Sequence, residues 1–252
     1  MAGGRPAEDD PLYKYSRGRP KALIDVAGKP MISWILEAMI NARQIESIAV
    51  VGLETVPDFA HPVVFLPDQG SLADNVSSGL SWVRENRPEV NSLVISSSDI
   101  PTITGKIVDQ VVDLCESPDY AVYYPVVPIE SMLSRFPESN RTYVRLADLE
   151  AASSDLIVVH RPAFEIDLDL WRSITSARKY PWRIAKIVGL TTLLKLFTRR
   201  LTLEEATKKG EELVGHPVKV IQTEIAEIAM DVDTAEQMLL LNELLSSASE
   251  PT

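Results

Sequence analysis

Short apolar runs alternate with amphipathic stretches along most of the chain. Six of these runs are continuous and mostly rich in β-branched residues, which is typical of strands covered on both faces. They lie at residues 47–52, 62–66, 92–97, 120–127, 155–160 and 218–222. Between them, apolar residues at helical spacing predict helices at 31–43, 74–85 and 103–116, the last with Thr102 as its N-cap. The alternation predicts an α/β fold with a doubly wound, mostly parallel sheet.

Two regions break this rhythm. Residues 128–150 have no clear period and are interpreted as a loop excursion. Residues 161–213 are helical by pattern, with apolar positions interleaved with lysines and arginines. We expect residues 1–252 to form one domain with a helical cap or insertion at about 161–213. A helix lying on a membrane surface is the open alternative for this stretch.

Composition and charge narrow the classes of protein. The 252 residues are 45% hydrophobic and 24% charged, which is ordinary for a soluble globular protein. The net charge of −11 argues against nucleic acid as a partner. Residues 1–30, however, carry six basic and four acidic groups. A basic pocket on an acidic protein suits a small polyanion.

The number of cysteines and the lengths of the apolar runs indicate the cellular compartment of the protein. Cys115 is the only cysteine, so we expect no internal disulfide and no cysteine-based metal site. No run reaches the roughly 18–20 apolar residues that a transmembrane helix needs, and Met1 leads into glycines rather than a signal peptide. The sequence therefore predicts a cytoplasmic protein with no transmembrane segment.

The N-terminal region offers a candidate phosphate site. Gly3 and Gly4 can present bare backbone N–H groups to phosphates. Lys21 and Lys29 place two cations before the first predicted helix, where a lysine can neutralise charge that develops during nucleotidyl transfer. The alternative interpretation is a solvated basic loop.

Acidic residues form two further candidates. Asp99 directly follows a predicted central strand, at the edge where open α/β sheets bind ligands, and such a carboxylate suits Mg²⁺. Asp231 and Asp233 share one face if residues 230–234 are extended, and two like charges there need a cation between them. Thr234 and Gln237 have the spacing of a capping box. The alternatives are a helix cap at Asp99 and two solvent-facing acids at the second place.

The order of these motifs is more specific than any one of them. The elements are Ala2-Gly3-Gly4, Pro20-Lys21-Ala22-Leu23, Gly28-Lys29-Pro30-Met31, Ser98-Asp99-Ile100-Pro101 and Asp231-Val232-Asp233-Thr234. In this order they resemble the MobA-like NTP transferases, relatives of the sugar-nucleotide pyrophosphorylases.

The resemblance implies a role for each matching position. Ala2, Gly3 and Gly4 would lie on the triphosphate, and Lys21 would be the cationic catalytic residue. Asp99 would bind Mg²⁺ and take part in catalysis, with Asp231 or Asp233 as the second metal ligand. Asn75 falls in the stretch 69–75, where the family recognises the base.

The chain departs from the family pattern in three places. Members carry a short hydrophobic strand before the Ala-Gly-Gly loop, whereas this sequence begins at the loop, so we expect the first central strand to be missing from the sheet. The arginine that members carry two or three residues beyond the glycines is absent, since Arg5 comes too early, and Arg17 or Arg19 would take its place. A Gly-Gly-Asn element expected on the acceptor side is replaced by residues 149–154.

The leading function is a Mg²⁺-dependent nucleotidyltransferase that moves an NMP from an NTP to a small phosphorylated or hydroxylated acceptor and releases pyrophosphate. One alternative is a glycosyltransferase of similar architecture, which would place an Asp-x-Asp at the strand end where this chain has only Asp99. The other is a degenerate, non-catalytic member that binds a nucleotide or a protein partner.

Overall fold

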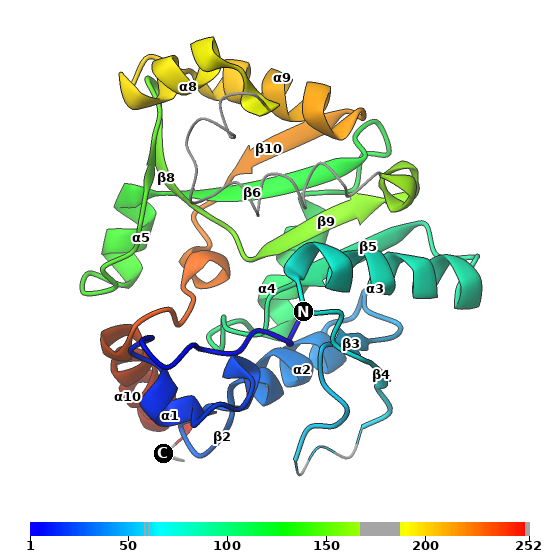
Figure 1. Ribbon diagram of the computed structural model, residues 1–252, viewed down its shortest axis with the longest axis vertical. Helices are drawn as coiled ribbons and strands as arrows, with labels where there is room; N and C mark the ends of the chain where they lie inside the picture. The colour runs from blue at the N-terminus through cyan, green and yellow to red at the C-terminus, as the bar shows by residue number, and fades with distance from the viewer. Residues whose placement is uncertain (58, 60, 167–186, 250–252) are drawn as a thin grey trace.

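The protein is an α/β fold built on a mixed central sheet (Figure 1). The computed structural model describes residues 1–57, 59, 61–166 and 187–249. The main sheet runs in the order β5 (Ser92–Ser96), β9 (Leu156–His160), β6 (Val122–Pro128), β8 (Glu150–Ser153) and β7 (Val144–Arg145), with β10 (Val218–Gln222) also paired with β6. A separate parallel pair is formed by β3 (Ala49–Val51) and β4 (Val64–Leu66), and a small antiparallel pair by β1 (Asp25–Val26) and β2 (Lys29–Pro30).

Helices connect and cover these strands. In the described residues the α-helices are α1 (Tyr13–Ser16), α2 (Met31–Asn41), α3 (Leu72–Asn86), α4 (Gly105–Asp113), α5 (Ile129–Arg135), α8 (Leu190–Phe197), α9 (Leu203–Val214) and α10 (Ala235–Ser249). The same part of the chain contains three short 3₁₀ segments, η1 (Lys21–Leu23), η2 (Arg161–Glu165) and η3 (Ala226–Ala229). The six predicted strands and the three predicted helices are all present, with ends shifted by a few residues.

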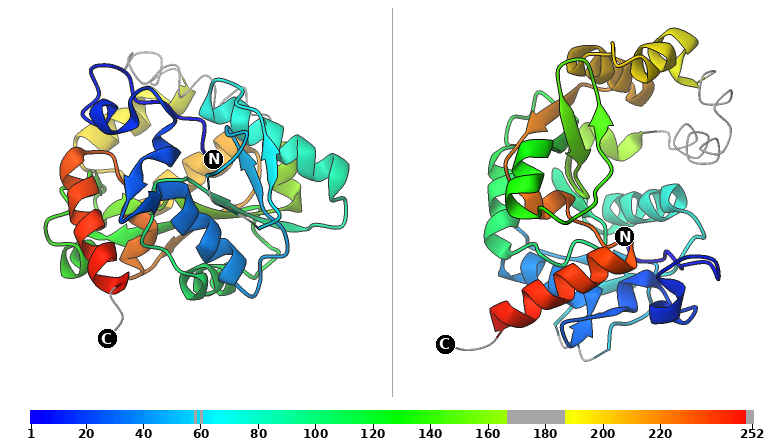
Figure 2. Two further views of the ribbon diagram at one scale, coloured as in Figure 1. Left: turned by 90° about the horizontal axis from the view of Figure 1, so that it is seen from below. Right: turned by 90° about the vertical axis from the view of Figure 1, so that its left-hand side faces the viewer.

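The sheet is covered on both faces, as its apolar strands predict (Figure 2). Val158 and Val159 are consecutive in β9 and point to opposite faces, as in any strand. Val158 packs into the cluster that includes Val108 of α4, whereas Val159 packs with Leu80 of α3. This two-sided burial explains why β9 is apolar at successive positions instead of alternating.

The strand directions are more mixed than the sequence predicted. β5, β6 and β10 share one direction, but β9 lies antiparallel between β5 and β6. β8 returns antiparallel along β6, and only Ser154 and Asp155 separate it from β9. β9 continues in the direction of β8, so it too is antiparallel to β6, and it also pairs with β5.

Two local predictions are corrected. The N-cap of α4 is Thr104, whose hydroxyl accepts a hydrogen bond from the N–H of Ile107, rather than Thr102. The predicted loop at 128–150 contains helix α5 and strand β7. The capping box at Thr234 and Gln237 is confirmed, since each side chain bonds the backbone N–H of the other residue.

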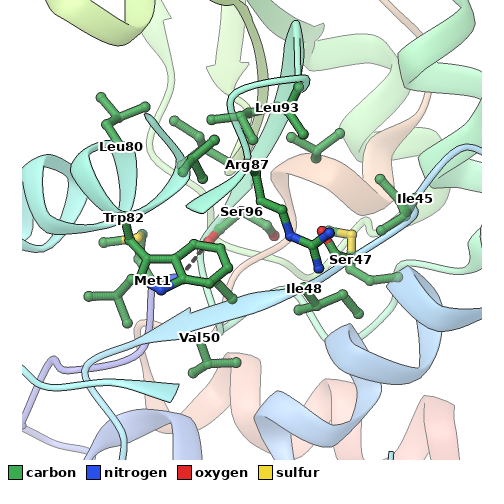
Figure 3. Close-up of a pocket in the computed structure, with 18 of the residues that line it drawn as sticks. Met1, Ile45, Ser47, Ile48, Val50, Leu80, Trp82, Arg87, Leu93 and Ser96 are labelled. Carbon is green, nitrogen blue, oxygen red and sulfur yellow. Dashed lines mark hydrogen bonds between the residues drawn. The ribbon is translucent and has the colours of Figure 1, made fainter. Parts of the chain in front are cut away.

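β3 and β5 are not paired with each other. A cavity of about 570 Å³ lies between them, lined by side chains of α2, α3 and both strands (Figure 3). Met1 and Ala2 lie at its end: the Met1 ammonium donates to the Ser96 carbonyl at 2.8 Å, and the Ala2 N–H donates to the Val51 carbonyl at 2.8 Å. Burial lowers the pKa of the Met1 ammonium to about 6, although Asp99 opposes the shift.

The predicted helical cap is represented by η2, α8 and α9. Part of the predicted region, residues 167–186, lies outside the described residues. Within the described ranges, no helix is long and apolar enough to cross a membrane.

Candidate active site

Three segments that are far apart in sequence meet at one cluster of charges. The Lys21 ammonium lies 2.6 Å from Asp99 Oδ2 and 2.7 Å from Asp233 Oδ1. Lys21 and Asp99 are largely shielded, with side chains 19% and 17% exposed, whereas Asp233 is 63% exposed. The structure thus brings together Lys21, Asp99 and Asp233, three of the residues that the sequence singled out.

Backbone contacts hold each of these residues in place. The N–H of Lys21, in η1, donates to the Gly4 carbonyl at 2.8 Å, which links the lysine to the glycine loop. Asp99 follows β5, and its carbonyl accepts from the N–H of Val232 at 2.9 Å. Val232 is fully buried, so its neighbours in sequence, Asp231 and Asp233, are carried to the end of β5.

The ammonium of Lys21 takes the position of a cation between two carboxylates. Burial lowers the pKa of Lys21, but Asp99 and Asp233 outweigh burial and raise it above its ordinary value. The lysine is therefore charged at neutral pH. The second carboxylate oxygen of Asp99, Oδ1, is buried and has no hydrogen-bond partner among the described residues, so it keeps lone pairs for another ligand.

Asp231 has a different partner from Asp233. Its Oδ1 accepts a hydrogen bond from Nη1 of Arg141, and both side chains are about nine-tenths buried. Nη2 of Arg141 also lies 3.9 Å from Asp155 Oδ2. In this structure Asp231 therefore balances a buried guanidinium, which leaves Asp233 as the acid that shares a cation with Asp99.

Asp155 was missed in the sequence analysis. It lies at the break between β8 and β9, where its carbonyl accepts from the N–H of Ser97 and its N–H donates to the Ile228 carbonyl. Burial, and then the nearby Asp99 carboxylate, raise the pKa of Asp155 to about 7, while Arg141 acts in the opposite direction. No local motif marks this residue, because only the strand pairing brings it beside Asp99.

The raised pKa predicts a pH-dependent effect of Asp155→Asn on stability. In the unfolded chain this carboxyl titrates near its ordinary pKa of about 4, so between about pH 4 and pH 7 the folded state keeps a proton that the unfolded state has lost. The free energy of unfolding of the wild type therefore falls as pH rises through this window. The Asp155→Asn variant does not show this fall, because an amide does not titrate. From the acid end to the neutral end of this window, the free energy of unfolding of the variant should rise by about 1–3 kcal/mol relative to that of wild type. One pKa unit is worth about 1.4 kcal/mol, and partial exposure of Asp155 screens some of it.

Urea unfolding in metal-free buffer, at several pH values across this window, measures the effect. Asp119→Asn is the matched control, since Asp119 is exposed and remote from the cluster. A stability difference between Asp155→Asn and wild type that does not change with pH would show that Asp155 titrates normally in the folded protein.

The glycine loop packs closely against its neighbours on one side. A Cβ on Gly3 would lie 2.4 Å from Asp68 Oδ1, and one on Gly52 would lie 2.2 Å from the Gly3 nitrogen. Around Gly4, by contrast, no described atom lies within 4 Å of an added Cβ. The loop is thus fixed at Gly3 and open at Gly4. Ala2 is buried with its N–H already bonded to Val51, so it positions the loop.

Asn75 holds the neighbouring segment in place. Its Oδ1 accepts from the N–H of Gln69 at 2.7 Å, and its Nδ2 donates to Asp68 Oδ1 at 2.8 Å. Because Asn75 is buried at the start of α3, these bonds fix the 67–70 segment beside Gly3. Lys29, the other cation of the N-terminal region, pairs with Glu37 and lies over the Trp34 ring, so it is engaged elsewhere.

The donor set fits Mg²⁺ supplied together with a nucleotide. Among the residues the structure describes, no group of three or more acidic, histidine or cysteine side chains is arranged to hold a metal alone. Mg²⁺ usually takes one or two protein carboxylates and completes its shell with water and substrate phosphates. The buried, unpartnered Oδ1 of Asp99 and the exposed carboxylate of Asp233 meet that requirement.

Comparison with known proteins identifies the family of the chain. The sequence profile of the MobA-like NTP transferase domain matches residues 2–238. A hypothetical transferase from Thermus thermophilus has a similar solved structure, with 32% sequence identity and a TM-score of 0.80 over 94% of this chain and 96% of that chain. A structure of CMP:2-keto-3-deoxy-manno-octonic acid synthetase complexed with CTP, 12% identical, has a TM-score of 0.52 over 90% of this chain and 92% of its own. At that identity it shows the fold alone.

A curated relative is similar over a shorter region. The 2-C-methyl-D-erythritol 4-phosphate cytidylyltransferase of Parasynechococcus marenigrum is 34% identical over 80 residues, which is 29% of this chain. The match spans 35% of that protein, or about a third of its length.

Proposed function

The chain belongs to the MobA-like NTP transferase family, and from this premise we propose that it transfers an NMP from an NTP to a small phosphorylated or hydroxylated acceptor and releases pyrophosphate. The observation that supports the proposal most is the cluster of Lys21, Asp99 and Asp233 beside the glycine loop. It combines a backbone loop for phosphates, a positive group and two acids suited to a cation.

Different residues of the chain would have different roles in such a transfer. The open loop at Gly4 gives the triphosphate access to backbone N–H groups. Lys21 is fixed by its backbone bond to the same loop, so its ammonium would face phosphate oxygens once a metal ion relieves it of the carboxylates. There it stabilises the charge that develops as an acceptor oxygen attacks the α-phosphorus and the bond to pyrophosphate breaks.

We propose that Asp99 and Asp233 hold Mg²⁺, with Asp231 kept in place by Arg141 as their support. When bound, Mg²⁺ neutralises phosphate charge and polarises the phosphoryl group. Lys21 lies between the two carboxylates in this structure, and with those carboxylates on Mg²⁺ its ammonium would be free to contact the nucleotide phosphates.

The acceptor is proposed to lie on the side of Arg141 and Tyr143. Arg141 Nε and the Tyr143 hydroxyl are buried and have no hydrogen-bond partner in the described part of the chain. Buried donors without partners are costly, by about 1–3 kcal/mol each. A phosphate or hydroxyl oxygen of an acceptor would satisfy them.

Pyrophosphate release tests the function. The four NTPs, with CTP first because the curated relative is a cytidylyltransferase, are combined with phosphosugars, polyols and cofactor precursors in the presence of Mg²⁺. For the productive pair, Lys21→Ala should lower kcat by roughly a hundredfold with a modest change in KM, because one lost transition-state contact is worth about 3 kcal/mol.

Lys29→Ala is the matched control, because Lys29 is a cation of the same region but pairs with Glu37. It should leave kcat near that of wild type. If Lys21→Ala raised KM alone, Lys21 would be a ground-state phosphate contact. If no NTP released pyrophosphate with any acceptor, yet a sugar nucleotide raised the melting temperature, the glycosyltransferase alternative would replace the proposal.

A further inference from the structure

Helix α8 is an apolar helix with no buried residue. Five of its eight residues are leucine or phenylalanine, yet none of the eight is buried. Leu190, Leu194 and Phe197 are 72%, 60% and 72% exposed. They stand at positions i, i+4 and i+7, so they form one stripe along the helix. Large apolar side chains gathered on one exposed face mark an interaction surface.

The polar side of α8 is the side turned to the protein. Thr191, Thr192 and Lys195 line a groove together with Glu205 and Lys208 of α9. The Lys195 ammonium lies 2.5 Å from Glu205 Oε1 across this groove. Because the polar positions face α9, the stripe of Leu190, Leu194 and Phe197 faces away from the body of the protein.

The charged residues that adjoin this stripe along the described chain are basic. Arg199 and Arg200 follow the helix after Thr198 and are exposed. Residues 187–203 contain three basic residues, Lys195, Arg199 and Arg200, and no acidic one, although the whole chain has a net charge of −11. An apolar face flanked by lysines and arginines is the pattern of helices that lie in the interface of an anionic membrane.

From these observations we propose that α8 docks the protein on an anionic lipid surface, with Leu190, Leu194 and Phe197 in the interface and Arg199 and Arg200 at the headgroups. The helix lies at the top of Figure 1, away from α2 and α10 at the opposite end, so docking leaves that part of the molecule free. This inference does not depend on the proposed reaction.

A second copy of the chain fits the stripe less well. Even an aromatic side chain covers only about 150–250 Å², and a stable dimer buries roughly 800 Å² on each partner. Three partly exposed side chains stay below that area. A bilayer needs no matching surface, so a short stripe with adjoining cations is sufficient for reversible binding.

Vesicle co-sedimentation of the full chain tests the proposal. Vesicles of phosphatidylcholine with about 30% phosphatidylglycerol should sediment the wild type at low salt, and pure phosphatidylcholine vesicles should not. Replacing Leu194 and Phe197 together with glutamine should weaken partitioning by roughly tenfold or more, and Arg199→Gln with Arg200→Gln should weaken it by a similar factor and reduce its salt dependence. Leu239→Gln is the matched control, since Leu239 is 58% exposed but lies on α10.

Several results would overturn the proposal. These are no sedimentation with anionic vesicles, equal partitioning of the Leu194/Phe197 variant and the Leu239 control, or binding to duplex DNA in place of vesicles. A dimer in sedimentation equilibrium that the Leu194/Phe197 variant abolishes, without any vesicle binding, would assign the stripe to a second copy. Pyrophosphate release is measured in parallel without vesicles, so that failure of the docking proposal and failure of the proposed reaction are distinguished.

Discussion

Asp99→Ala is expected to abolish Mg²⁺-dependent nucleotidyl transfer while the protein stays folded. Asp99 offers a buried oxygen with no partner among the described residues, and its other oxygen lies beside Lys21. Its loss removes one of the two acids proposed to hold the ion, and a single group that acts on developing charge is worth about 10²–10³ in rate. The fold should tolerate the change, because Lys21 keeps Asp233 and the repulsion between Asp99 and Asp155 disappears.

Turnover as a function of Mg²⁺ concentration, together with thermal unfolding, measures both parts of this prediction. Asp119→Ala is the control, an exposed acid whose hydroxyl partner is Ser117. Near-normal turnover of Asp99→Ala at an unchanged Mg²⁺ requirement would reject the metal assignment. An unfolded Asp99→Ala protein would instead show that the Lys21 pair is structural, and Asp99→Asn then keeps the test possible.

Much of the fold was predictable because its signals are local. Continuous apolar runs mark strands covered on both faces. β9 packs against α3 on one face and α4 on the other, which shows the physical basis of that rule. Strand direction is not encoded in such a run. β9 is antiparallel to β5 and β6 because the chain continues through Ser154 and Asp155 in the direction of β8, and this course is seen only in the strand pairing of the folded sheet.

The candidate site shows the same difference between signals that are local in sequence and contacts that form only in the folded protein. Lys21, Asp99 and Asp233 are recognised from motifs whose order resembles a known family, and the structure places them within hydrogen-bond distance although 212 residues separate the first from the last. Arg141 and Asp155 carry no motif of their own. Their importance depends on burial and on neighbours brought by strand pairing, and neither can be seen in the residues beside them in sequence.

An apolar strand added ahead of Met1 is expected to stabilise the protein strongly. The cavity of about 570 Å³ between β3 and β5 is lined largely by apolar side chains such as Ile32, Val50, Leu80 and Leu93. The Met1 ammonium is buried at its end, in bonding distance of Ser96 at the end of β5, so residues joined to Met1 would enter the cavity directly (Figure 3). Six to ten added residues, about a usual strand length, would pair with the facing edges of both strands.

The expected gain follows from the groups that such a strand would satisfy. Each edge group of β3 and β5 that gained a backbone hydrogen bond would add about 0.5–1.5 kcal/mol. The buried Met1 amine, whose pKa is lowered to about 6, would also become an ordinary peptide N–H. Several such groups together give roughly 5 kcal/mol, which for a chain of this size raises the melting temperature by about 10–20 °C. NTP affinity should rise as well, because the strand leads into Gly3 and Gly4 and would fix the loop further.

Two matched controls separate strand pairing from simple extension. A glycine-serine segment of equal length adds chain without apolar side chains, and an apolar segment with proline at alternate positions fills space but lacks the N–H groups of a ladder. Neither should raise the melting temperature by more than a few degrees. If all three extensions gave the same melting temperature and the same NTP affinity as the present chain, the free edges of β3 and β5 would gain nothing from pairing with a further strand. The cavity would then be a stable feature of the fold, and Ala2, Gly3 and Gly4 would be held in place by their bonds to Val51 and by the contacts with Asp68 and Asn75 alone.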